Sequence, residues 1–342
     1  MNWKDYIIKY QFCKIFCYTV IKKGSFMIKI FTILVLITIN LMAFDYSTTP
    51  QAKAFINKMH AKYGFSKSYV RNILKHAKHS SYALNRYNGT IKNATDYSWA
   101  RYKSKILIPE SIELGKDFMN RYSHSLAIAK RLFGIDKEII TAFIRVESKF
   151  GLYGSEFRVI DVLTTLAFNP NRKRRFFRSE LEKLFLMARK ANVDILELRG
   201  SFAGAMGYVQ QMPSIYLRYA VDLDGDGVKN PNSMSDCIGS IAKFLKHNGW
   251  RNYRDTVIKP VVKGNKFKRL RSRVLSRYSV NTLINYGIYP PYRSGSFYFI
   301  RLYNGNGYDV YLGDKNYKVI TRYNHSKQYA VSIALYAKAL KK

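Results

Sequence analysis

The sequence predicts a mainly α-helical protein with one small β-rich part. Apolar residues recur at i, i+3, i+4 and i+7 through much of residues 50–250, which is the spacing that lines one buried helix face. Residues that cap helices, such as Ser, Asp and Gly, stand at the ends of these stretches. Between about 257 and 320 the composition shifts to Tyr, Val, Gly and Asn, which favours strands and turns.

Residues 1–43 are predicted to be an export signal. The segment from Ile30 to Phe44 carries no charge and follows Lys29 and two further lysines. It is too short and too rich in Thr and Asn for a membrane span, and it suits the apolar region of a signal peptide. Cleavage is expected after Ala43, and a retained N-terminal segment that associates with the membrane is the alternative. Met27 would be a more ordinary start for such a signal.

Cysteine usage agrees with export. The chain has cysteines at positions 13, 17 and 237, and cleavage would leave Cys237 alone. One cysteine cannot form an internal disulfide, and none directly follows the apolar segment to take a lipid. We therefore expect an exported protein without disulfides or a lipoprotein anchor.

The rest of the chain divides into four predicted parts. Residues 44–132 are helical and basic, and residues 133–256 hold most of the helix caps and apolar stripes. Residues 257–320 are β-rich, and residues 321–342 form a C-terminal helix that begins near Ser326. Within the second part we expect one helix between an N-cap at Asp136 and a C′ residue at Gly151, and two more over 179–189 and 235–247. Within the third, residues 295–303 and 308–312 flank a turn-prone Asn-Gly-Asn-Gly and predict a β-hairpin.

The formal net charge of +36 is extreme for 342 residues. Such a charge fits nucleic acid, an anionic membrane or an acidic polymer as partner, and it also fits a solvated surface rich in lysine. No five Lys or Arg stand in a row; the densest cluster is Arg172–Arg175. Charge alone leaves these alternatives open, although no known nucleic-acid-binding motif accompanies it and an exported chain would rarely meet that partner.

One carboxylate, Glu147, stands where the helical pattern asks for an apolar side chain. Ile140, Phe143, Ile144 and Glu147 follow the spacing of one helix face, between a predicted N-cap at Asp136 and a predicted helix end at Gly151. Such an acid either pairs with a cation or loses water and has its pKa raised. This helix alone favours a salt bridge with Arg145 or Lys149.

Two further stretches carry chemistry. In G-S-F-A-G-A-M-G-Y-V-Q-Q-M-P-S, residues 200–214, three glycines allow close backbone approach to a ligand, while Ser201 and Gln210 offer hydrogen bonds; a tightly packed loop is the alternative. In D-L-D-G-D-G-V, residues 222–228, oxygen side chains at positions 1, 3 and 5, Gly at 6 and a carbonyl at 7 match a calcium loop. Position 12 is Ser233 instead of the glutamate of an EF-hand, and a solvated acidic turn is the alternative.

Together these stretches resemble the membrane-bound lytic murein transglycosylase B family of lysozyme-like lytic transglycosylases. The resemblance covers about residues 98–342 and includes the following segments in the family's order: V-E-S-K-F-G (146–151), L-T-T-L-A-F (163–168), F-F-R-S-E-L (176–181), the 200–214 stretch, D-L-D-G-D-G (222–227), H-N-G-W (247–250) and R-Y-N-H-S (322–326). It implies a lysozyme-like catalytic core in residues 133–256.

The resemblance also implies a reaction. Glu147 would protonate the β-1,4 bond between MurNAc and GlcNAc in peptidoglycan, and would then act as base toward the muramic acid 6-hydroxyl, which closes a 1,6-anhydro ring. A glycosidase with two carboxylates would need a second acid across the bond. Glu156, Asp161 and Glu180 are available, but no motif marks any of them as a partner. A hydrolytic muramidase and a non-catalytic peptidoglycan-binding protein are the alternatives.

The remaining site residues are implied by the resemblance alone, and simple packing or solvation is the alternative for each. They are Ser201 and Gln210 toward the substrate, Tyr102, Tyr323, Asn324 and Tyr329 along the cleft, Arg172 and Lys173 toward peptide-stem carboxylates, and Asp222, Asp224, Asp226, the Val228 carbonyl and Asp236 as Ca²⁺ ligands. The chain departs from the family pattern at Gln211, where Phe is usual, and at Phe244, where a tyrosine is usual. No organic cofactor is expected.

Overall fold

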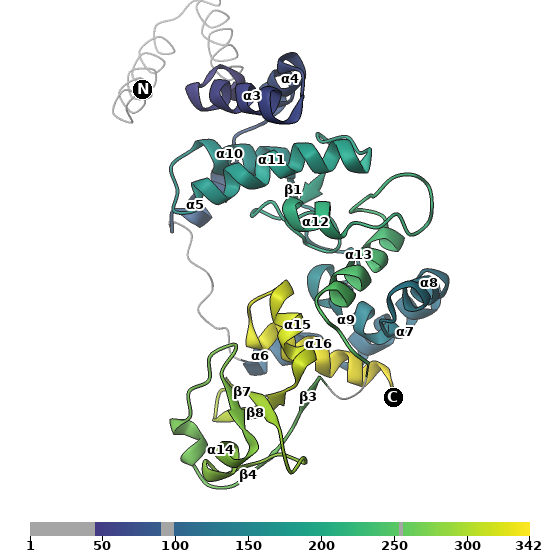
Figure 1. Ribbon diagram of the computed structural model, residues 1–342, viewed down its shortest axis with the longest axis vertical. Coiled ribbons are helices and arrows are strands. Elements are labelled where there is room, and N and C mark those ends of the chain that lie inside the picture. Colours follow the sequence, from purple (N-terminus) through teal and green to yellow (C-terminus); the bar gives the residue numbers. More distant parts are fainter. Residues whose placement is uncertain (1–44, 90–98, 253–255) are drawn as a thin grey trace, which may run out of the picture.

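The computed structural model describes residues 45–89, 99–252 and 256–342 of the chain (Figure 1). The predicted export signal, with Cys13 and Cys17, lies outside the described residues. Within the described ranges, no helix has the length and apolar character needed to span a bilayer. The molecule is elongated, with helices at one end and in the middle and a β-rich part at the other end (Figure 1). The predicted mainly α-helical class is therefore confirmed.

Short helices with strong caps form the first end of the molecule. Thr49, Ser66 and Ser80 each accept a hydrogen bond from the backbone N–H three residues ahead, which satisfies a free donor at a helix start. These helices pack on two helices from later in the chain. The elements of this end are η1 (Tyr46–Thr48), α3 (Pro50–Tyr63), α4 (Lys67–His76), α5 (Ser81–Tyr87), α10 (Val159–Phe168) and α11 (Arg174–Ala191).

The middle of the molecule is built around one buried helix, α9 (Lys137–Ser148). Residues 139–145 of this helix are all buried, because α7, α8, α13 and α16 pack around it. The other elements of this part are α6 (Trp99–Ile106), α7 (Pro109–Arg121), α8 (Ser123–Phe133), β1 (Phe157–Arg158), β2 (Arg199–Gly200), α12 (Pro213–Tyr219), α13 (Met234–His247), α15 (Lys315–Tyr323) and α16 (Lys327–Leu340). The predicted start of the last helix is confirmed, since Ser326 caps α16.

The predicted limits of the α9 helix need one correction. Asp136 is the N-cap residue as predicted, but its side chain makes no capping hydrogen bond. The helix ends at Ser148 with Lys149 as its C-cap, so the C′ residue is Phe150, one position before the predicted Gly151. Lys149 and Phe150 have left-handed backbone conformations, with φ of 48° and 62°. The Ser148 hydroxyl accepts a hydrogen bond from the Gly151 N–H at 3.0 Å and closes the turn.

The β-rich end is a four-stranded antiparallel sheet of order β3-β8-β7-β5, and it contains the predicted hairpin. Successive side chains of β7 point to opposite faces. Phe297 and Phe299 enter a small apolar cluster inside this end, while Tyr298, Ile300 and Leu302 enter the main core. The elements are β3 (Val257–Ile258), β4 (Val261–Val262), η2 (Lys266–Arg269), β5 (Arg277–Ser279), α14 (Val280–Asn285), β6 (Ile288–Tyr289), β7 (Ser296–Tyr303) and β8 (Tyr308–Gly313).

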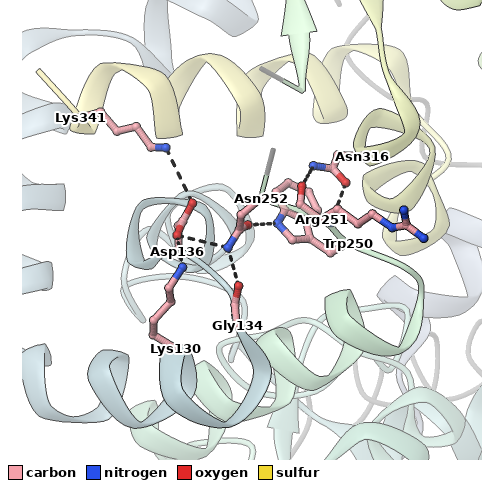
Figure 2. A network of polar contacts seen from close by, with 8 residues as sticks. All are labelled: Lys130, Gly134, Asp136, Trp250, Arg251, Asn252, Asn316 and Lys341. Atoms are coloured by element: carbon pink, nitrogen blue, oxygen red, sulfur yellow. Dashed lines mark hydrogen bonds and ion pairs between the residues drawn. The ribbon is translucent and has the colours of Figure 1, made fainter. Parts of the chain in front are cut away.

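A polar network fixes the start of α9 (Figure 2). Asp136 forms ion pairs with Lys130 at 2.5 Å and with Lys341, at the end of α16, at 3.8 Å. The Asn252 amide donates to the Gly134 carbonyl and, at 3.3 Å, to Asp136. The network therefore joins α8, α9 and α16 at one point.

The same network continues to α15. The Trp250 indole N–H donates to Asn252 at 2.6 Å, and the Asn316 amide exchanges hydrogen bonds with the backbone of Arg251 at 2.6 and 3.1 Å. These residues line a cavity of about 300 Å³. The cavity lies at the opposite end of α9 from Glu147, so we assign it to bracing of the fold.

The glycines of the 200–214 stretch do not make room for a ligand. An added Cβ would lie 2.0 Å from the Ala205 carbonyl oxygen at Gly200, 2.4 Å from Leu163 at Gly204 and 1.9 Å from the Pro231 carbonyl oxygen at Gly207. The chain's own atoms occupy the space that the sequence interpretation gave to a ligand. The alternative, a tightly packed loop, is confirmed.

Gly207→Ala should destabilise the protein far more than Gly264→Ala. Both glycines have positive φ, 55° and 68°, so alanine is strained at both by about 1–2 kcal/mol. Only Gly207 has backbone within reach of the added Cβ, while Gly264 faces open space. Overpacking should add about 1–3 kcal/mol at Gly207. Urea denaturation of the two variants measures the difference, and equal losses would contradict the packed-loop interpretation.

Candidate active site

Glu147 lies half-buried in the last turn of α9. The predicted apolar face is confirmed, since Ile140, Phe143 and Ile144 are fully buried. No ion pair to Glu147 is found in the part of the chain that the structure describes.

The two cations that could have paired with this acid are engaged elsewhere. The Arg145 guanidinium donates to the Ser111 hydroxyl at 2.6 Å and to the Lys105 carbonyl at 2.8 Å. The Lys149 ammonium lies 4.8 Å from the centre of the Tyr153 ring. The salt-bridge interpretation of Glu147 is therefore wrong.

Three of the predicted tyrosines surround the acid. Tyr329, at the start of α16, donates its hydroxyl proton to Glu147 Oε1. Tyr323, at the end of α15, has its ring nearly parallel to that of Tyr329, with 6.4 Å between ring centres and 12° between planes. Tyr102, on α6, is close enough to Glu147 that the charge of the carboxylate helps to raise the pKa of the tyrosine hydroxyl. The Phe143 ring meets Tyr323 and Tyr329 edge-on at 5.0 and 6.1 Å.

This apolar and aromatic pocket changes the ionisation of its members. Burial raises the pKa of Glu147 to about 8, and the hydrogen bond from Tyr329 acts in the opposite direction. Burial, followed by the charge of Glu147, raises the pKa of Tyr102 to about 12, and the same two causes raise the pKa of Tyr329 far above 10. At neutral pH the pocket therefore holds a protonated acid among neutral tyrosines, and the acid is poised to give up its proton.

Ser201 and Gln210 serve the loops beside this pocket. The Gln210 amide nitrogen donates to the carbonyls of Gly154 at 2.6 Å and Gly207 at 2.9 Å, which ties the loop after α9 to the 200–214 stretch. The Ser201 hydroxyl accepts from the Ala203 N–H at 3.4 Å. Their predicted contacts with substrate stay predictions.

The other predicted substrate residues are exposed. Asn324 is the C-cap of α15, where its carbonyl accepts from the Ser326 N–H at 2.7 Å. Arg172 and Lys173 stand in the loop before α11 and line an open hollow formed by residues 170–176. Both cations face solvent, as a contact to a peptide-stem carboxylate would require, and that contact stays a prediction.

Each candidate for a second catalytic carboxylate has a structural contact. Glu156 accepts from the Gly154 N–H at 3.2 Å, Asp161 from the Lys78 N–H at 2.8 Å, and buried Glu180 from the Ser214 N–H at 3.0 Å. None of the three touches Glu147 or its tyrosines in the described residues. Within these residues Glu147 is therefore a single acid.

The aspartate loop brings three carboxylates together. Ligand atoms of Asp222, Asp224 and Asp226 all lie within 4.8 Å of one another. The Asp222 carboxylate is held by the N–H groups of Gly225 and Gly227 at 2.8 and 2.9 Å. Three hard oxygen ligands of one charge at this spacing fit a cation such as Ca²⁺.

Asp236 and the Val228 carbonyl are the two other predicted ligands. Asp236 is fully buried and accepts from the N–H groups of Leu223 and Asn230 at 2.8 and 2.7 Å, and burial is the main cause that raises its pKa to about 6. The Asp236 carboxylate holds the backbone of the loop through these two hydrogen bonds. It is not part of the close group formed by the other three aspartates. The Val228 N–H donates to Asp226 at 2.8 Å, and its carbonyl stays a predicted ligand.

Sequence reasoning missed Val209 and Trp99 among the residues that shape the pocket, whereas it named Phe244 as a departure from the family pattern. The Val209 carbonyl accepts the Tyr323 hydroxyl at 2.5 Å, and the Phe244 ring packs edge-on against Tyr323 at 4.9 Å. Trp99 stacks on Tyr102 at 6.4 Å. A backbone carbonyl leaves no trace in a sequence, whereas Trp99 stands three residues before Tyr102 on one helix face and was open to prediction.

Comparisons with known proteins agree on one family. The transglycosylase SLT domain profile matches residues 47–338. The chain is similar to the membrane-bound lytic murein transglycosylase B of Escherichia coli (strain K12), with 36% identity over 302 residues that cover 85% of this chain and 83% of that protein.

Solved structures are similar over most of the fold. The Escherichia coli lytic transglycosylase Slt35, solved in complex with calcium, is 36% identical, with 88% of this chain and 96% of that chain covered and a TM-score of 0.79. The soluble lytic transglycosylase SltB1 from Pseudomonas aeruginosa is 32% identical, with 85% and 98% covered and a TM-score of 0.79.

Glu147→Gln should stabilise the protein increasingly as the pH rises. Between about 4.5 and about 8 the folded wild type holds a proton on Glu147 that the unfolded chain has lost, so its free energy of unfolding falls with pH across this window. The slope is at most about 1.4 kcal/mol per pH unit. Glutamine at position 147 does not titrate, so the variant lacks this pH dependence of the free energy of unfolding. Urea denaturation at pH 5, 6.5 and 8 measures the gap, with the exposed Glu110→Gln as control. A gap that does not grow with pH would contradict the desolvated acid.

Proposed function

This chain belongs to the lytic transglycosylase family that the transglycosylase SLT domain defines, and we propose that Glu147 carries out its chemistry. The protein is a lytic murein transglycosylase that acts on peptidoglycan. The observation that supports the role of Glu147 is its place: a single acid, protonated at neutral pH, hydrogen-bonded by Tyr329 at the end of the buried helix α9.

In the first step protonated Glu147 gives its proton to the oxygen of the β-1,4 bond between MurNAc and GlcNAc. The raised pKa provides the proton near neutral pH. As the bond breaks, Glu147 becomes a carboxylate, and the Tyr329 hydroxyl stabilises it through a charge-assisted hydrogen bond. Tyr102 and Tyr323 exclude water from the acid and remain neutral.

In the second step the Glu147 carboxylate takes the proton of the muramic acid 6-hydroxyl. That hydroxyl closes onto the anomeric carbon as a 1,6-anhydro ring, so one side chain serves first as acid and then as base. Glu156, Asp161 and Glu180 are each held in a structural contact, so among the described residues none of these three candidates is placed to act as a nucleophile beside Glu147. Attack by the substrate's own 6-hydroxyl therefore fits the single acid Glu147 better than a mechanism that needs two carboxylates.

Substrate would be held by residues around this acid. The cleft residues are Tyr102, Tyr323, Asn324 and Tyr329, with Ser201 and the Gln210 carbonyl oxygen toward the N-acetyl group. Arg172 and Lys173 would meet peptide-stem carboxylates, because both cations face solvent. The large positive charge suits a substrate that carries many carboxylates.

The aspartate loop would bind one Ca²⁺ through Asp222, Asp224 and Asp226. The ion would neutralise three close carboxylates and stiffen the connection between α12 and α13, which flank the pocket. Asp236 and the Val228 carbonyl would complete the ligand set. We further propose a periplasmic location, with any membrane association through the N-terminal segment.

Digestion of purified sacculi should leave glycan ends that carry 1,6-anhydro-MurNAc. Mass spectrometry of the products identifies them. Glu147→Gln should lower the rate at least 1,000-fold, since acid and base are lost together, while Glu110→Gln should leave it unchanged. Reducing MurNAc ends would identify a muramidase, and binding by the wild type without cleavage would identify a non-catalytic wall protein.

Added Ca²⁺ should raise the melting temperature of the wild type above its value in chelator. At a free concentration a hundred times the Kd, the stabilisation is about 2.7 kcal/mol. Asp224→Asn should lose most of this response, because it weakens the close triad, whereas the exposed Asp117→Asn on α7 should keep it. A wild type that melts at one temperature with and without Ca²⁺ would refute the metal site.

A further inference from the structure

The side-chain amide of Gln211 is buried and has no hydrogen-bond partner among the described residues. Its side chain is 3% exposed, and neither Nε2 nor Oε1 makes a hydrogen bond within the described structure. Its backbone is fixed, since the carbonyl accepts from the Met206 N–H at 2.8 Å. A buried amide without partners costs about 1–3 kcal/mol, so an apolar side chain would fit this place better if stability were all that counted.

The amide lies against the hydroxyl of Tyr323. Burial is the main cause that raises the pKa of Tyr323, and the Gln211 amide acts in the opposite direction, although their contact does not meet the geometry of a hydrogen bond. The Tyr323 hydroxyl already donates its one proton to the Val209 carbonyl at 2.5 Å. It can therefore only accept from Gln211, and the amide N–H is the group placed to donate.

Tyr323 packs against Tyr329, the residue that donates a hydrogen bond to the catalytic acid. Its ring is parallel to that of Tyr329, and Tyr329 donates to Glu147. Gln211 and Phe244 both contact Tyr323. An apolar ring and a buried amide therefore both adjoin Tyr323.

We infer that Gln211 is a positioning residue, whose amide donates to Tyr323 when glycan fills the cleft and so holds the Tyr323–Tyr329 pair against Glu147. Hydrogen bonds of a catalytic site are often long or poorly aligned without substrate and shorten in the complex. The unmade bonds of Gln211 fit such a contact. The inference rests on the proposed role of Glu147 and adds a residue that acts through Tyr323.

The test is Gln211→Met, which keeps the length of the side chain and removes the amide. Loss of one neutral hydrogen bond that forms only with substrate should lower kcat about tenfold and leave KM within about twofold. The melting temperature should stay the same or rise, because the unpaired amide is gone. A purely structural role predicts the reverse, a lower melting temperature with kcat intact, and that result would overturn the inference.

A matched control comes from Thr164 on α10, whose buried hydroxyl oxygen also lacks a partner in the described structure. Thr164→Val should match or exceed the wild-type melting temperature with kcat unchanged. Gln211→Phe, with the residue usual in the family, is a second test variant and should show the same loss of kcat as Gln211→Met.

A double-mutant cycle with Tyr323→Phe separates this inference from the assignment of the acid. If Gln211 acts through the Tyr323 hydroxyl, Gln211→Met should lower kcat no further in the Tyr323→Phe background. Two independent losses that multiply would refute the path through Tyr323. An active Glu147→Gln would remove the catalytic assignment alone, while the coupling between positions 211 and 323 would still be decided by the cycle.

Discussion

The hydrogen bond from Tyr329 to Glu147 is the contact on which the rest of the structure depends. An acid that must be protonated near neutral pH needs a dry pocket, yet the carboxylate it becomes needs a donor. Burial and one tyrosine hydroxyl meet both needs at the end of α9. Because α16 runs antiparallel to α9, the same pair of helices is joined at its far end by Asp136 and Lys341 (Figure 2).

The distant parts of the chain serve this contact. α16 begins where the β-rich end meets the core: the Lys327 ammonium donates to the carbonyls of Ser272 at 2.8 Å and Arg301 at 3.0 Å. One face of β7 enters the main core, so the sheet holds the first turn of α16, and hence Tyr329, in place. The β-rich end therefore helps to position the active site through its contacts with the start of α16.

Much of this was open to prediction from the sequence, for identifiable reasons. Helix faces, the β-hairpin and the cap at Ser326 depend on local patterns, and the grouping of Glu147 with Tyr102, Tyr323 and Tyr329 followed from family resemblance. The interpretations that failed depend on tertiary contacts. Arg145 turns to Ser111 instead of Glu147, and the glycines of residues 200–214 pack against the chain itself. No local pattern shows that Gln211 is buried without a partner.

The central claim is that the fold keeps Glu147 protonated at neutral pH. Carbon-13 NMR of the glutamate carboxyl groups, titrated from pH 4 to pH 10 and assigned by comparison with Glu147→Gln, measures this directly. One glutamate should titrate near pH 8. Its midpoint should be higher in Tyr329→Phe, because that variant loses the hydrogen bond that favours the Glu147 carboxylate. A Glu147 that titrates near its ordinary value of 4.5 would contradict the account.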